Sequence, residues 1–131
     1  MDTPDPRTSI TGIGQLSVNA RDLPRAVRFY QESLGLRLLF QVPPKMAFFQ
    51  CGEVRLMVAL PERPEFDHPS SILYFRVADI VATAAALGGR GVRFDAAPHR
   101  VHKAADHELW LAFFTDSEGN QLALMSEVRG A

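Results

Sequence analysis

The chain has 131 residues, of which 47% are hydrophobic and 22% are charged, so it can form one compact domain or two small modules that share a core. Its formal net charge is −1 and its Lys and Arg residues are spread along the chain, which argues against nucleic-acid or anionic-membrane binding. The apolar runs are too short for a membrane span of ~20 residues, and the single cysteine, Cys51, excludes an intrachain disulfide. No segment resembles a signal peptide, so we expect a cytoplasmic protein.

Residues 1–9 are polar, contain two prolines and are predicted to form a flexible tail. Residues 10–60 are predicted to form a first module with the order strand, helix and three strands. Apolar residues alternate up to Asp22, which is typical of a helix N-cap, and then follow at helical spacing to Leu34. Gly35 is predicted to end the helix, and LRLLFQV, MAFFQC and VRLMVAL are predicted to be strands.

Residues 61–70 are rich in proline and charge and are predicted to be a linker. Residues 71–128 then repeat the same order, with ILYFRV as the first strand, a helix capped by Asp79, and GVRF, ELWLAFFTD and QLALMSEV as strands. The polar stretch DAAPHRVHKAAD is predicted to be an exposed connection between two of these strands. FFQCGEVRLMVAL and FFTDSEGNQLALM match each other around turns at Gly52 and Gly119, which indicates an internal repeat.

Three segments at matching places in the repeat are ARDLPRAVRFYQESLGL, FRVADI and TDSEGNQLALM. Through them, about residues 12–127 resemble the vicinal oxygen chelate superfamily, which includes glyoxalase I, extradiol dioxygenases and bleomycin-resistance proteins. The resemblance implies an α+β fold in which two βαβββ modules form curled mixed sheets around a cup, with the helices on the convex side. It also implies a homodimer in which two modules, commonly from different chains, close each cup.

Enzymes of this superfamily hold a divalent metal in the cup with His, Gln or Glu side chains. By this resemblance, the four ligand positions fall on Gln15, Met57, Ile72 and Ala123. Three of these are apolar, and such side chains do not replace the water shell of a metal ion. We therefore expect neither a metal nor another cofactor.

Alternation along the strands predicts which side chains face the cup. They combine amide, hydroxyl, guanidinium and phenol groups with thioether and aliphatic groups, as is typical of a small-molecule pocket. The predicted pocket residues are Gln15, Ser17, Arg55, Met57, Ile72, Tyr74, Arg76, Gln121 and Ala123, with Trp110 as a pocket wall, an interface residue or a core residue. Arg55 and Arg76 either reach solvent or clamp a carboxylate or phosphate.

The segment HRVHKAADHELW contains His99, His102, His107 and Glu108, groups that bind zinc or act as general acids and bases in other proteins. Its spacing matches no zinc motif, so a solvated loop and a pocket lid are alternatives. His107 and Glu108 are weak candidates for catalytic residues.

The leading hypothesis is a protein that binds a small amphipathic molecule, with an acidic group as one option. It would sequester this molecule, in the manner of bleomycin-resistance proteins, or convert it without a metal, so its status as an enzyme stays open. One alternative is a metal-dependent lyase, isomerase or dioxygenase with ligands rerouted from the His99–Glu108 segment. Another is a structural or regulatory module with a vestigial pocket.

Overall fold

The computed structural model describes residues 10–129, and the tail predicted at residues 1–9 lies outside this range. The first half contains β1 (Gln15–Asn19), α1 (Leu23–Arg28), a π-helical turn η2 (Phe29–Ser33), β2 (Arg37–Val42), β3 (Met46–Cys51) and β4 (Val54–Ala59). After the 3₁₀ helix η3 (Pro64–Phe66), the second half contains β5 (Leu73–Arg76), α2 (Ile80–Gly89), β6 (Arg93–Phe94), β7 (His99–Lys103), β8 (His107–Thr115) and β9 (Gln121–Arg129).

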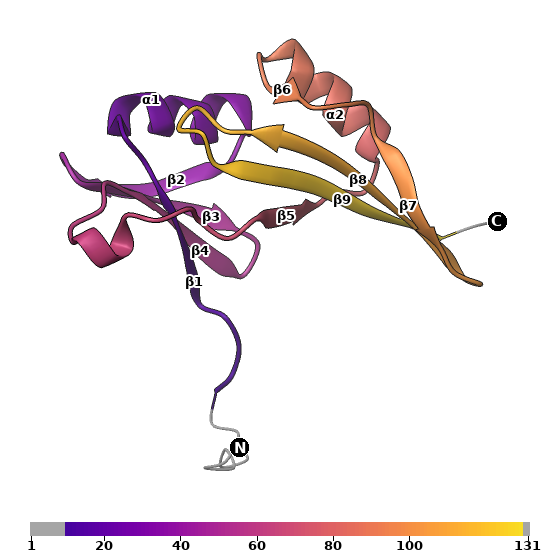
Figure 1. Ribbon diagram of the computed structural model, residues 1–131, viewed down its shortest axis with the longest axis horizontal. Coiled ribbons are helices and arrows are strands. Elements are labelled where there is room, and N and C mark those ends of the chain that lie inside the picture. Colours follow the sequence, from indigo (N-terminus) through magenta and orange to yellow (C-terminus); the bar gives the residue numbers. More distant parts are fainter. Residues whose placement is uncertain (1–9, 130–131) are drawn as a thin grey trace.

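The strands form two mixed sheets, which confirms the predicted α+β fold. The first sheet has the order β1-β4-β3-β2, and the second has the order β5-β9-β8-β6, with β7 paired to β8. In each sheet the first strand runs parallel to the last one and the other pairs are antiparallel. We call β1–β4 with α1 the first module and β5–β9 with α2 the second module. Figure 1 shows α1 and α2 on the same side of the two sheets.

Both helices begin where the sequence predicts. Asp22 Oδ1 accepts a hydrogen bond of 3.1 Å from the backbone N of Arg25, and Asp79 Oδ1 accepts one of 3.0 Å from Ala82. Gly35 follows the first helical segment with φ +77°, a conformation that glycine adopts without a steric penalty. No helix within residues 10–129 is both long and apolar enough to cross a membrane.

The side chains on the helix-facing side of both sheets form one hydrophobic core. Val18, Leu56 and Val58 of the first module are at most 1% exposed, and Phe114 and Leu122 of the second module are fully buried in the same cluster. The alternation in the strands therefore turns one face of each sheet to the helices and the other face away from them. That second face is the one on which the sequence predicts a cup.

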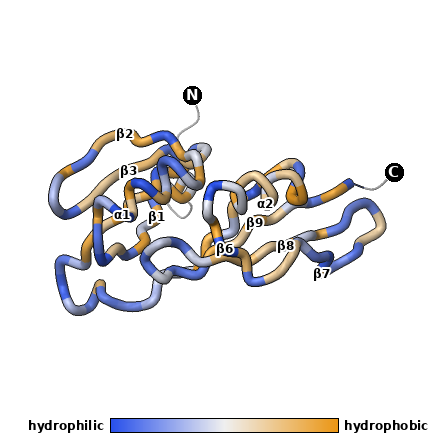
Figure 2. The backbone as a smooth tube through the Cα atoms, turned by 90° about the horizontal axis from the view of Figure 1, so that it is seen from above, coloured by the Kyte–Doolittle hydropathy of each residue, from blue (hydrophilic) through white to orange (hydrophobic). Residues whose placement is uncertain are grey.

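The connection predicted between β6 and β8 contains an additional strand, β7. His99 of β7 pairs with Leu111 and Lys103 pairs with Glu108, and all residues of β7 are exposed. Figure 2 shows that β7 is mostly hydrophilic. The connection is exposed, as predicted, but part of it is a strand, because edge pairing uses backbone groups and does not require apolar side chains.

The turn between β8 and β9 docks on the start of α1 (Figure 1). Glu118 accepts hydrogen bonds from the backbone N of Arg21 at 2.7 Å, the backbone N of Asp22 at 2.8 Å and Nε of Arg25 at 2.8 Å. Burial of the Glu118 carboxylate opposes its ionisation, but these bonds and one from Ser117 outweigh burial and lower its pKa to about 2. We call this contact, together with the bond between Tyr30 and Asp116, the module clasp.

Candidate functional site

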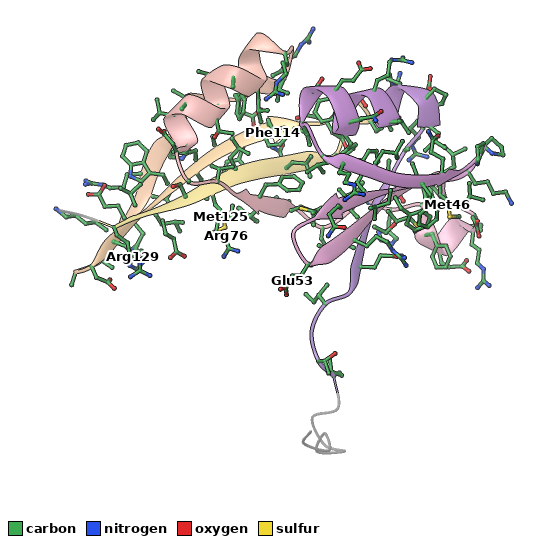
Figure 3. The ribbon with its side chains drawn as sticks, turned by 180° about the vertical axis from the view of Figure 1, so that it is seen from behind. Met46, Glu53, Arg76, Phe114, Met125 and Arg129 are labelled. Carbon is green, nitrogen blue, oxygen red and sulfur yellow. The ribbon has the colours of Figure 1, made fainter. Side chains whose placement is uncertain are left out.

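A cavity of about 490 Å³ lies on the face of the first sheet that points away from α1. Strands β1, β3 and β4 supply its floor, and the segment that follows β4 supplies its roof. The floor residues are Ser17, Asn19, Met46, Met57 and Ala59, and the roof residues are Leu60, Pro61, Glu62, Phe66, His68, Ser70 and Ser71. We call this cavity the sheet cup. Figure 3 shows Met46 near η3, at the roofed end of the sheet.

Asn19 fixes the roof of the sheet cup. Its Nδ2 donates to the carbonyl oxygens of Phe66, at 3.0 Å, and of His68, at 2.8 Å, and its backbone N donates to Ser70 Oγ at 3.2 Å. Its backbone oxygen accepts a bond of 2.7 Å from Asn120 Nδ2, in the β8–β9 turn. One residue thus joins the floor, the roof and the second module.

The lining of the sheet cup is mixed in polarity. Met46 and Met57 contribute thioethers, which adapt to ligands of different shapes. His68 Nδ1 lies 2.9 Å from the carbonyl oxygen of Pro69. Because a carbonyl only accepts, Nδ1 donates, and the other ring nitrogen of a neutral His68 is an acceptor. Such a combination can orient an organic molecule with a few polar contacts.

Gln15 and Arg55 lie together next to Met57. Arg55 Nε donates a bond of 2.7 Å to Gln15 Oε1, and Gln15 Nε2 lies 3.8 Å from Met57 Sδ. The guanidinium carbon of Arg55 is 5.0 Å from the ring centre of Phe48, which stacks on Phe40 at 4.4 Å. Arg55 is thus already engaged by an amide and an aromatic ring.

The four positions that the resemblance assigns to metal ligands carry few groups that bind metal ions. The oxygen of Gln15 accepts from a guanidinium, and a cation at that place would be repelled. Met57 offers a weak thioether, Ile72 is 44% exposed and carries no donor, and Ala123 has only a methyl group. Elsewhere in residues 10–129, no three His, Cys, Asp or Glu side chains are grouped so that they could hold a metal ion.

The predicted pocket residues of the second sheet do not line the sheet cup. Tyr74 and Arg76 border a separate cavity of about 900 Å³, which also reaches Leu16 and Glu53 of the first module. Figure 3 shows Arg76 and Met125 on the side away from the helices. The structure of one chain therefore brings Ser17 and Met57 into one cavity and Tyr74 and Arg76 into another.

Gln121 and Ala123 are further from solvent than Tyr74. Gln121 Nε2 donates to the carbonyl oxygen of Phe114 at 2.9 Å. Ala123 pairs with Tyr74 on one side and with Phe113 on the other, and is fully buried. Neither side chain lines the two cavities described above.

Trp110 and Glu108 lie on the helix-facing side of β8. Trp110 pairs with Ser126 and packs against the core, and its Nε1 donates to Glu108 Oε1 at 3.1 Å. This bond, with a second from Arg100 at 3.2 Å, lowers the pKa of Glu108. His107 projects from the other face and lies 2.8 Å from Asp106 Oδ1. None of these residues lines the sheet cup.

Several residues of the sheet cup were not predicted from the sequence. Met46 pairs directly with Ala59, so a register for β3 and β4 would have identified it. The roof residues, such as Phe66 and His68, give no such signal. They come to the site through hydrogen bonds to Asn19, from 47 and 49 residues away in the chain.

The fold is that of many known proteins. TnmS3, an antibiotic binding protein from Streptomyces sp. CB03234, is 24% identical, with a TM-score of 0.72 over 92% of this chain and 98% of that chain. A superfamily member from Sphaerobacter thermophilus is also 24% identical, with a TM-score of 0.72 over 90% and 98% of the two chains. Lactoylglutathione lyase from Agrobacterium tumefaciens is 18% identical, with a TM-score of 0.70 over 91% and 96%. At these identities the likeness shows the fold alone.

No curated protein matches the sequence. The model of the protein family Glyoxalase/Bleomycin resistance protein/Dioxygenase superfamily matches residues 12–124. This range includes the first module, the linker and the second module up to the start of β9, and it agrees with the two-sheet topology. The chain belongs to the glyoxalase/bleomycin resistance protein/dioxygenase superfamily.

Proposed function

We propose that the protein binds a small amphipathic organic molecule in the sheet cup. The observation that supports this most is the roofed cavity of about 490 Å³, whose size lies within the range of small-molecule sites. Its floor contains Ser17 and Met57, two of the predicted pocket residues, and Asn19 holds its roof in place. Because the roof is already fixed, less conformational entropy of the protein is lost when a ligand binds.

We propose that binding does not require a metal. The bond between Arg55 and Gln15 supports this. It engages the side-chain oxygen of Gln15, which is the one oxygen ligand among the four resembled metal positions, and it brings a positive charge next to it. Chemistry in the cup would have to rely on side chains of the chain itself. The imidazole of His68 is the one aromatic base that lines the cavity, and no Ser, Thr or Cys hydroxyl or thiol is hydrogen-bonded to it among residues 10–129. This arrangement favours sequestration over conversion.

A second copy of the chain is proposed to complete the cup. Strands β1 and β5 lie at the edges of their sheets. The aromatic side chains of Phe40 and Tyr74 are 47% and 46% exposed. Such edges and apolar surfaces are usually covered in stable proteins. A partner chain would then cover the open side of the sheet cup.

The test is a thermal-shift screen of small organic molecules with a variant that fills the cavity. Met57→Trp places a large side chain on the floor, and Val81→Trp adds the same ring on α2, where Val81 is 62% exposed. We expect hits to stabilise the native protein and Val81→Trp, and to leave the melting temperature of Met57→Trp unchanged. Hits that stabilise all three equally would place the ligand elsewhere and overturn the proposal.

A further inference from the structure

We infer that the sheet cup prefers an organic amine, protonated at neutral pH, to a carboxylic acid of the same shape. The inference rests on the proposed function, since it names the ligand class of the same cavity. It differs from the acidic option suggested by the sequence, which depended on Arg55 and Arg76. Neither arginine lines the sheet cup of its own chain.

The one carboxylate around the sheet cup only accepts hydrogen bonds, whereas the hydroxyls of Ser17, Ser70 and Ser71 can donate or accept. Glu62 contributes a carboxylate, and it forms no ion pair with another described residue. Nδ1 of His68 is turned to the carbonyl oxygen of Pro69, so in the uncharged ring the second nitrogen is an acceptor. The thioethers of Met46 and Met57 are weak acceptors. An ammonium group has three N–H donors and can satisfy such partners, whereas a carboxylate has none.

Two arginines near the cup make their contacts outside it. Arg55 is bound to Gln15 and lies over Phe48, on the neighbouring part of the sheet. Arg63 of the roof lies 5.5 Å from the ring centre of Phe66, and its Nη1 is 3.6 Å from Glu65. Neither lines the cavity, so the one fixed charge in the lining is that of Glu62. A carboxylate ligand would meet a like charge there, which discriminates against acids.

The rest of the lining suits the apolar part of such a ligand. Met46, Met57 and Phe66 surround the cavity, and thioethers make favourable contacts with aromatic rings. The hydroxyl of Ser17 on the floor can donate or accept and does not select for charge. An aromatic body with a short aminomethyl group therefore matches the apolar and the polar parts of the lining.

The test uses three probes that share a naphthalene ring: 1-naphthylmethylamine, 1-naphthalenemethanol and 1-naphthaleneacetic acid. Each is titrated at pH 7 by calorimetry. We expect the amine to bind most tightly and the acid most weakly. Glu62→Gln should weaken the amine by about two- to fivefold, as expected for a solvated ion pair, and leave the alcohol unchanged. Added salt should narrow the difference between amine and acid. Glu65→Gln is the matched control, because Glu65 lies in the same segment after β4 but does not line the cavity.

The outcomes separate the two proposals. Equal affinities for all three probes, each lost in Met57→Trp, would keep the binding function and overturn the preference for amines. Tighter binding of the acid, or an equal effect of Glu62→Gln and Glu65→Gln, would also overturn the preference. Binding of none of the probes would count against the cavity itself, and hence against the proposed function as well.

Discussion

The phenol group of Tyr30 donates a hydrogen bond of 2.5 Å to Asp116 Oδ2, across the boundary between the two modules. Tyr30 is fully buried and Asp116 is 6% exposed. Burial first, and then the charge of Asp116, raise the pKa of Tyr30 well above its ordinary value, so the hydroxyl stays protonated and keeps donating. Asp116 also accepts from the backbone N of Glu118 and Asn120, so this bond is one part of a connected network.

Tyr30→Phe removes this bond and leaves the ring. We expect a loss of about 1.5–3 kcal/mol in the free energy of unfolding, the range for hydrogen bonds to charged groups. The measurement is urea unfolding, with an unchanged dependence on urea concentration. Tyr74→Phe is the control, since Tyr74 is 46% exposed and has no described hydrogen bond through its hydroxyl. A similar small loss in both variants would mean that water replaces the Asp116 bond without cost.

Glu118 makes the stability of the clasp dependent on pH. Its pKa is lowered from 4.5 to about 2, so the folded state binds a proton less readily than the unfolded state. Its contribution is therefore complete above about pH 4.5 and is lost as the pH falls towards 2, and it amounts to at most about 3.4 kcal/mol. Glu118→Gln should flatten the stability profile between these pH values. A profile parallel to that of the native protein would show that other carboxyl groups cause the acid sensitivity.

Asn19→Ala should loosen the roof of the sheet cup without changing its floor. The variant loses the bonds to the carbonyl oxygens of Phe66 and His68 but keeps the backbone bonds of β1. We expect faster hydrogen exchange in residues 61–70, measured by mass spectrometry, with little change in β3 and β4. Ser17→Ala, which alters the floor and no roof bond, is the control. Unchanged exchange in the Asn19 variant would mean that other contacts hold the roof.

Purified protein should contain no stoichiometric zinc, nickel, manganese or iron at the Gln15 site. Arg55 bonds to the one oxygen donor there, and Met57, Ile72 and Ala123 are poor or impossible ligands. We expect elemental analysis to find less than one metal per chain, and a chelator to leave the melting temperature unchanged. Metal near one per chain that disappears in His99→Ala would favour instead the enzyme with ligands from the His99–Glu108 segment.

Light scattering should show a dimer at micromolar concentration. The proposed dimer would cover the edge strands β1 and β5 and the exposed side chains of Phe40 and Tyr74. Tyr74→Glu puts a charge on this surface and should shift the protein towards the monomer, whereas Val81→Glu on α2 should not. A native protein that is monomeric throughout would contradict the proposed completion of the cup.

The repeat made the fold predictable, because the chain contains the order strand, helix and further strands twice. Asp22 and Asp79 cap the two helices, and Gly52 and Gly119 have positive φ in the two matching turns. Alternation also predicted which face of each strand is buried, since a shift by one residue would expose Val18 and Val58. Local patterns of this kind depend only on neighbours in the sequence, so they can be read without the structure.

The site was less predictable, because it depends on contacts between distant segments. Alternation placed Ser17 and Arg76 on the same kind of face, but it could not tell that the two sheets of one chain put them in different cavities. It also gave no sign that the linker folds back over the first sheet. Trp110 shows another limit, since its register opposite Ser126 and beside the core became clear only from the pairing of β8 with β9.

The module clasp has a consequence for the order in which the chain can fold during synthesis. The backbone N–H groups of Arg21 and Asp22 bind the carboxylate of Glu118, which follows Asp22 by 96 residues. Until the ribosome has released residue 118, the start of α1 has only water to satisfy these groups, and Tyr30 lacks its acceptor. The first module is thus expected to emerge as an incompletely packed intermediate that becomes native when the β8–β9 turn arrives.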